Sequence, residues 1–268
     1  MQDPIHKVII TGTGRAGTTF LVRLLSECGL DTGFSRRTWR RDYYAHGQAG
    51  LERSIISPRA PYIVKNPDLC ESLPAVLATG RFVIDRAIVP IRDLESAAMS
   101  RARVGGRNGS LHGGLWKTGD PAAQKAVLGE LFHGLMHTLA EHDIPITLIL
   151  FPRMVEDADY TYDKLHFLVG KIPRPRFHRI FGRIADPGLV HQFRPNPAAP
   201  APMLPPAEFE RARREYGRRR QLGPASVRLG MAVAFLILLF GIWHFRARLG
   251  EIETAHRSFA ARLGFLTP

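Results

Sequence analysis

The chain has 268 residues, of which 45% are apolar, and a net charge of +13. This length allows one globular domain of about 200 residues and an appendage. With only Cys28 and Cys70, a disulfide scaffold is excluded, their spacing matches no metal site, and a reducing compartment is favoured. The positive charge favours an anionic small molecule, a membrane surface or nucleic acid as partner.

The first predicted elements are a buried strand over residues 6–11 and a helix over residues 16–28. Gly12, Gly14 and Gly17 lie between them. A strand followed by a glycine-rich turn and a helix aims backbone N–H groups and the positive end of the helix at one point. Residues 12–19, which we call the anion-binding loop, therefore predict a site for phosphate or sulfate.

This loop fits two common nucleotide motifs poorly. The dinucleotide motif needs a second strand ending in an acidic residue about 20 residues on, and the segment around Asp31 is no buried strand. The loop of nucleoside triphosphatases needs a lysine where Thr18 stands. A glycine turn without a ligand is another interpretation.

Residues 14–19, Gly-Arg-Ala-Gly-Thr-Thr, resemble the 5'-phosphosulfate loop of sulfotransferases that use 3'-phosphoadenosine-5'-phosphosulfate (PAPS). Arg15 occupies the position of that family's Lys or Arg, and Phe20 the position where many members carry Trp. The resemblance implies PAPS as co-substrate and no metal. It also implies the following nucleotide-binding residues in this loop: Gly14, Arg15, Ala16, Gly17, Thr18, Thr19 and Phe20.

A second predicted strand, residues 87–91, ends at Arg92, and a helix follows through Ser100. The eight positions between Arg92 and Ser100 are a little over two helical turns, so both can face one side. A guanidinium and a hydroxyl can clamp a phosphate monoester, and the pair is similar to the family's 3'-phosphate motif. A capped helix with a surface arginine and a solvated serine is the alternative.

The short strand over residues 62–65 ends in Lys65-Asn66-Pro67. Cytosolic members of the family have Lys-Thr-His here, which implies that Lys65 aids the leaving group. Pro67 stands where the family's general base would be, so the base remains open. The catalytic candidates are Arg15, Lys65, Asp68 and His46, with Glu52 and Glu71 as alternatives.

The rest of the domain has a basic, aromatic loop over residues 32–51, which could bind nucleic acid or an anionic or sugar acceptor. Residues 104–120 form a glycine-rich lid or a plain connector. We expect a helix at 121–142, a strand at 144–151 and a helix at 160–169. The family's C-terminal Arg-Lys-Gly element is missing, and its possible substitutes are Lys171, Arg174, Arg176 and Arg183.

The tail begins with a proline-rich and arginine-rich linker, residues 195–228. Residues 229–245 contain no Asp, Glu, Lys or Arg and would span about 26 Å as a helix. This predicts a transmembrane helix, with a buried or dimerisation helix as the alternative. The arginine excess on its N-terminal side predicts a cytoplasmic catalytic domain and argues against nucleic acid. A short amphipathic helix is expected within 246–268.

Together these features predict a three-layer α/β fold with a parallel central sheet over residues 1–194, related to nucleotide kinases. The predicted function is sulfuryl transfer from PAPS to a hydroxyl or amine of a glycan, lipid-linked or small-molecule acceptor. A kinase-like phosphotransferase and a catalytically silent, membrane-tethered nucleotide-binding protein are the alternatives. The sequence does not predict the oligomeric state.

Overall fold

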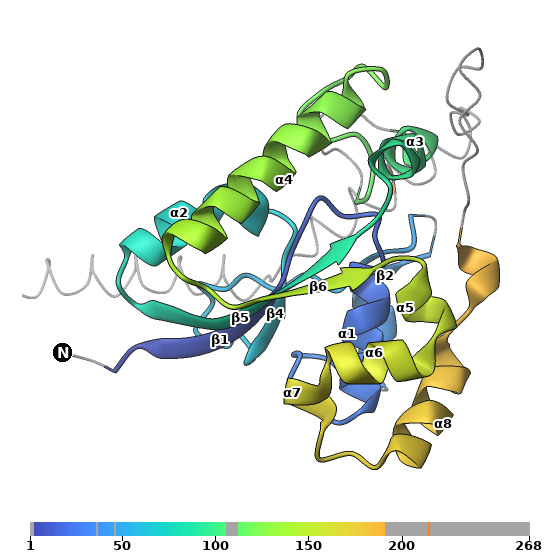
Figure 1. Cartoon of the computed structure of the whole chain (residues 1–268). Helices are drawn as coiled ribbons and strands as arrows, with labels where there is room; N and C mark the ends of the chain where they lie inside the picture. Colours follow the sequence, from blue (N-terminus) through green and yellow to red (C-terminus); the bar gives the residue numbers. More distant parts are fainter. Residues whose placement is uncertain (1–2, 36, 46, 106–111, 191–213, 215–268) are drawn as a thin grey trace, which may run out of the picture. The chain divides into compact units, whose positions relative to one another are not determined.

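A computed structural model describes residues 3–35, 37–45, 47–105, 112–190 and 214. Four parallel strands form the central sheet in the order β4-β1-β5-β6, as Figure 1 shows. The predicted parallel α/β fold is therefore confirmed for this part of the chain. The strands are β1 (Ile5–Ile10), β4 (Ile63–Lys65), β5 (Phe82–Ile91) and β6 (Ile146–Leu150).

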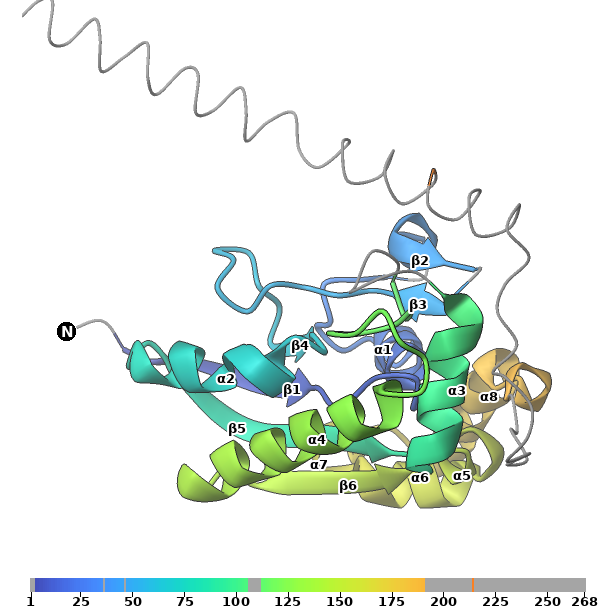
Figure 2. The same ribbon diagram turned by 90° about the horizontal axis from the view of Figure 1, so that it is seen from above.

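Helices cover both faces of this sheet, which explains why the strands are apolar at consecutive positions. Val8 and Ile10 belong to one hydrophobic cluster and Ile9 to the other. The first face packs against α1 (Thr18–Glu27), α5 (Arg153–Glu156), α6 (Ala158–Lys164), α7 (His166–Val169) and α8 (Arg174–Ile184). The second packs against α2 (Leu69–Ala78), α3 (Leu94–Val104) and α4 (Gln124–Glu141). Figures 1 and 2 show α2 and α4 on the side of the sheet opposite α1.

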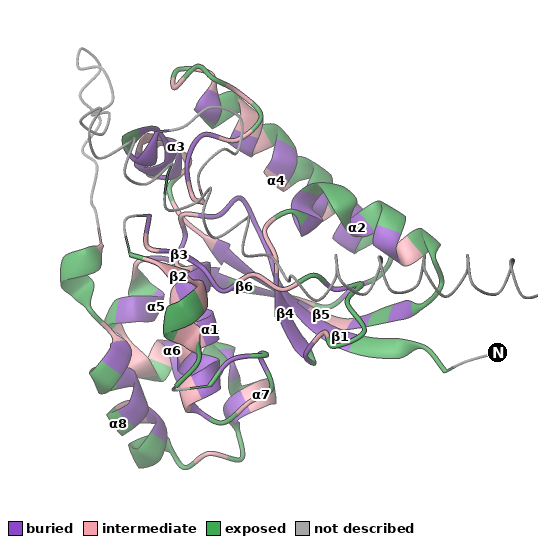
Figure 3. Cartoon of the chain, turned by 180° about the vertical axis from the view of Figure 1, so that it is seen from behind, coloured by how far each residue is buried: buried purple, intermediate pink, exposed green. Residues whose placement is uncertain are grey.

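The strand order places a topological switch point at β1. The chain passes from β1 to β4 on one side and returns to β5 on the other. Ile10 pairs with Lys65 on β4 and with Ile88 on β5, so the carboxyl ends of β1 and β4 are level. In open parallel sheets, ligands bind outside the carboxyl ends of the strands at such a point. The anion-binding loop begins there, and Figure 3 shows β4 and the carboxyl-terminal part of β1 as buried, whereas the start of β1 is exposed.

Several predicted boundaries differ from the structure. Helix α1 begins at Thr18 rather than at residue 16, because Arg15 and Gly17 have φ angles of 57° and 80°, which an α-helix cannot include. The helix expected over 121–142 begins at Gln124. Strand β6 begins at Ile146 rather than at residue 144, and the helix expected over 160–169 is divided into α6 and α7.

Three α-helices and a small ladder were not predicted. Helix α2 contains Pro74, α5 is a single short turn, and α8 buries Phe177, Ile180, Phe181 and Ile184 at helical spacing. The loop predicted over 32–51 also contains a 3-10 helix, η1 (Trp39–Asp42), and an antiparallel pair, β2 (Tyr43–Tyr44) with β3 (Ala49–Gly50).

No helix among the described residues is long and apolar enough to cross a membrane. The predicted linker, transmembrane helix and amphipathic tail, residues 195–268, fall outside the described part, apart from Arg214.

Candidate nucleotide-binding and catalytic site

The anion-binding loop has the backbone conformation that its glycines allow. Gly12, Gly14 and Gly17 have φ angles of 134°, 71° and 80°, in the region that L residues rarely adopt. A side chain at Gly17 would also collide with Met154 and lie 2.9 Å from Cδ2 of Phe151. The tight turn that opens α1 therefore requires glycine at this position.

Arg15 is the central side chain of the loop. Its Nε donates to the Ser100 hydroxyl at 2.9 Å, and its Nη1 donates to the Gly47 carbonyl. Burial, together with the neighbouring guanidinium groups of Arg92 and Arg103, lowers the pKa of Arg15 to about 10, although Tyr43 opposes this. A bound anion would relieve this concentration of positive charge.

Arg92 and Ser100, the predicted 3'-phosphate clamp, both contact Arg15. Arg92 Nη1 donates to the Arg15 carbonyl at 3.0 Å, and its guanidinium lies 4.9 Å from the Phe151 ring centre. Ser100 is only 2% exposed, so the alternative of a solvated serine is wrong. The residues of the two predicted anion sites are therefore in contact, because Arg15 of the anion-binding loop touches both Arg92 and Ser100.

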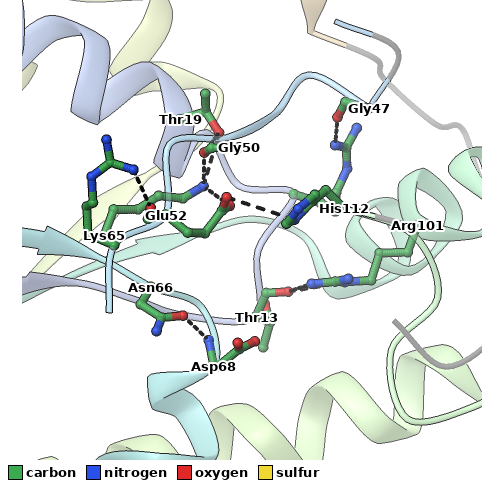
Figure 4. Close-up of polar contacts among 12 residues, drawn as sticks. Thr13, Thr19, Gly47, Gly50, Glu52, Lys65, Asn66, Asp68, Arg101 and His112 are labelled. Carbon is green, nitrogen blue, oxygen red and sulfur yellow. Dashed lines mark hydrogen bonds and ion pairs between the residues drawn. The ribbon is translucent and has the colours of Figure 1, made fainter. Parts of the chain in front are cut away.

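Lys65 lies on the other side of the loop and is 3% exposed. Its Nζ donates to the Gly50 carbonyl at 2.6 Å, to Oγ1 of Thr19 at 3.3 Å and to Oε1 of Glu52 at 2.5 Å. Figure 4 shows these contacts. Burial lowers the pKa of Lys65, and Glu52 opposes that shift.

Glu52 joins Lys65 to a histidine. Burial by itself would raise the Glu52 pKa, but Lys65 and, to a smaller extent, His112 outweigh it, and the net shift is downward. Glu52 Oε2 lies 3.9 Å from Nδ1 of His112, and the His112 ring stacks on Tyr44 at 4.3 Å between centroids. Lysine, glutamate and histidine therefore follow one another in space, as Figure 4 shows.

The predicted base candidates have different surroundings. Asp68 precedes α2 and is exposed; burial of part of the carboxyl and the charges of Glu52 and Glu71 raise its pKa, while His112 lowers it. Glu71 forms an ion pair with Lys117. His46 lies outside the described residues.

Two side chains of the site were missed by the sequence analysis. One is His112, in the segment treated as a lid or connector. The other is Arg101, which is 6% exposed and donates to the Thr13 carbonyl at 2.6 and 3.2 Å and to the Gly114 carbonyl at 2.6 Å. Burial and the charge of Arg15 lower its pKa to about 9. Arg101 thus holds the start of the anion-binding loop, and no sequence pattern marks a buried arginine one residue after Ser100.

Other predicted residues lie among packing or surface contacts. Phe20 is partly buried against the core and meets the edge of Phe181 in α8 at 5.7 Å between ring centres. Thr18 is 6% exposed, and Ala16 belongs to the core. Of the proposed substitutes for the missing Arg-Lys-Gly element, Arg174 pairs with Asp159 and Asp163, and Arg183 pairs with Glu27.

The described residues contain no group of three or more His, Cys, Asp or Glu side chains arranged to hold a metal ion. Cys28 and Cys70 are buried free thiols, and burial raises the pKa of each to about 11.

No family model matches the chain, and neither does any curated protein. Among solved structures, the sulfotransferase domain from the Synechococcus PCC 7002 olefin synthase matches with 12% identity and a TM-score of 0.40. The match covers 81% of this chain and 96% of that chain.

Proposed function

We propose that this protein transfers a sulfuryl group from PAPS to a hydroxyl or amine of an acceptor. The observation that carries the proposal is the meeting of Arg92 and Ser100 at Arg15, beside the opening of α1. Two adjacent cationic sites suit a nucleotide with phosphates at both its 5' and its 3' position.

Each residue has a role in this scheme. Arg15 and the backbone N–H groups of residues 14–19 bind the 5'-phosphosulfate. Arg92 and Ser100 bind the 3'-phosphate. Arg15 and Lys65 neutralise the charge that develops on the leaving phosphate. Lys65 is supported in this role by its place at the end of β4, level with the start of the anion-binding loop.

Isothermal titration with 3'-phosphoadenosine-5'-phosphate (PAP) and with ATP plus magnesium tests the proposal. We expect PAP to bind at least about ten times more tightly, a difference of about 1.4 kcal/mol. Tighter, magnesium-dependent binding of ATP would favour a phosphotransferase, and equally weak heats for both nucleotides would contradict the sulfotransferase proposal. PAPS labelled in its sulfate should also be tested for turnover with a range of acceptors. Tight PAP binding without any such turnover would indicate a catalytically silent binding protein.

We also propose that residues 229–245 tether the chain to a membrane with the catalytic domain in the cytoplasm, which favours a lipid-linked or envelope glycan as acceptor. The full chain should sediment with membranes, whereas a chain truncated after residue 194 should remain in the supernatant without detergent. Sedimentation of the truncated chain would contradict the tether.

A further inference from the structure

The proposed transfer needs a group that takes the proton from the acceptor, and the family's histidine position is Pro67 in this chain. We propose that His112 is that proton acceptor, and that Glu52 is a positioning residue that orients the His112 imidazole and holds Lys65 in place. This inference rests on the proposed function, since it assigns a step of the same reaction.

The first argument is the placement of His112. Its backbone carbonyl is 2.6 Å from the position that a Cβ on Gly47 would take. Arg15 Nη1 is 2.9 Å from the corresponding position on Gly113. The His112–Gly113 segment thus lies against Arg15 and against Ala49, the neighbour of Gly50, whose carbonyl accepts from Lys65. The imidazole lies 3.9 Å from Glu52, the carboxylate that pairs with Lys65.

The second argument is elimination among the described acidic side chains. Glu52 is bound to Lys65 at 2.5 Å, which makes its carboxylate a weak base. Glu71 is paired with Lys117. Asp68 is exposed and its pKa is raised, so it is a competing base that the assay below separates from His112. Imidazole is the side chain whose pKa lies nearest to neutral pH, as an efficient general base requires.

The third argument is the contact with Glu52. A carboxylate facing Nδ1 favours the tautomer with its proton on Nδ1, which places the lone pair on Nε2. Stacking on Tyr44 fixes the plane of the ring. Among the described residues, the charged or titratable groups that face His112 include Glu52, Asp68 and Tyr44, with Arg15 behind Gly113 and Lys65 behind Glu52.

The step balances. The acceptor O–H or N–H gives its proton to Nε2 of His112, and its oxygen or nitrogen forms a bond to sulfur. The bond between sulfur and the bridging oxygen of the 5'-phosphate breaks, and the electron pair stays on the phosphate, beside Lys65 and Arg15. The imidazolium that forms is stabilised by Glu52.

Turnover of the full chain tests His112 directly. PAPS labelled in its sulfate is supplied at fixed concentration, and release of inorganic sulfate to water is followed between pH 5 and 9. We expect His112→Gln to lower the rate at least about 100-fold and to remove the rise of rate with pH. PAP affinity should stay within about twofold of the unsubstituted chain, because His112 is not assigned to the nucleotide. His133→Gln, an exposed histidine on α4, is the matched control and should change neither quantity.

The competing bases are separated in the same assay. Asp68→Asn should keep the rise of rate with pH. If Asp68→Asn instead removes this rise, and His112→Gln retains the rate and the pH profile of the unsubstituted chain, the base is Asp68 and the proposal is overturned. Glu52→Gln should move the rise to lower pH, because removing a carboxylate disfavours the imidazolium. Glu52→Asp should restore part of this shift. An unmoved profile in Glu52→Gln would overturn the positioning role.

NMR titration of the His112 imidazole tests the proposal without any turnover. The His112 signal, assigned by its absence in His112→Gln, should titrate at lower pH in Glu52→Gln and at higher pH with PAP bound, since the nucleotide adds negative charge. A His112 signal that ignores both changes contradicts the proposal, whatever the turnover. Absence of PAP binding would instead contradict the proposed function and leave the coupling between Glu52 and His112 measurable.

Discussion

The two sides of the site differ in their balance of charge. On the β4 side, the Lys65 ammonium is paired with the Glu52 carboxylate, and a backbone carbonyl and a hydroxyl accept its other hydrogen bonds. On the β5 side, Arg15 and Arg101 donate to carbonyls or a hydroxyl, and their pKa values fall to about 10 and about 9.

The β4 side is therefore nearly neutral, whereas the β5 side contains two positively charged guanidinium groups close to each other. Burying cations near one another is unfavourable, and an anion of matching shape would remove the cost. We therefore expect the β5 side to provide most of the nucleotide affinity and the β4 side to contribute more to folding stability. The following predictions test this division, beginning with the largest expected effect.

Arg15→Ala should weaken PAP binding by about 30- to 100-fold, or about 2–3 kcal/mol, because charge-assisted hydrogen bonds to the 5'-phosphate are lost. Unfolding free energy should change by less than about 1 kcal/mol, since removal of a cation beside Arg92 offsets the lost contacts. Calorimetry and urea unfolding measure the two effects. Arg179→Ala, an exposed arginine on α8, is the control. Unchanged affinity in Arg15→Ala would contradict the division.

Arg92→Ala should weaken binding of PAP about tenfold more than binding of adenosine 5'-phosphosulfate, a difference of about 1.4 kcal/mol. The reason is that only PAP has the 3'-phosphate proposed to lie against Arg92. Calorimetry with both nucleotides provides the comparison. Equal losses for the two would show that Arg92 supports the loop through the Arg15 carbonyl rather than the nucleotide.

Glu52→Gln should have the smallest effect, a loss of about 1 kcal/mol of stability at pH 7. The Glu52 pKa is lowered in the folded chain. Its contribution is therefore present above the unfolded value of about 4.3 and is lost as the pH falls through the folded value. Urea unfolding from pH 7 to pH 3 should show the chain with Glu52 losing stability more steeply. Parallel curves would mean that the β4 side is not stabilised by this carboxylate.

The sequence alone determined much of the fold and one half of the site. The continuous apolar runs at Val8–Ile10 and Ala87–Ile91 indicated buried parallel strands, because strands covered on both faces have no polar face. Gly12, Gly14 and Gly17 marked a turn that only glycine accommodates easily. Arg15, Arg92 and Ser100 could be predicted as candidates because they are local to these elements, and the structure brings them into contact.

Only the tertiary structure shows which side chains from segments without a periodic pattern lie in the site. Glu52 and His112 are 60 residues apart, and neither a strand nor a helix contains them. Only the tertiary structure brings Glu52 to Lys65 and His112 to Glu52. Arg101 likewise is an ordinary helical arginine in the sequence, and only packing against the Thr13 carbonyl makes it part of the site. Long-range polar contacts of this kind follow from the path of loops, which local residue preferences do not determine.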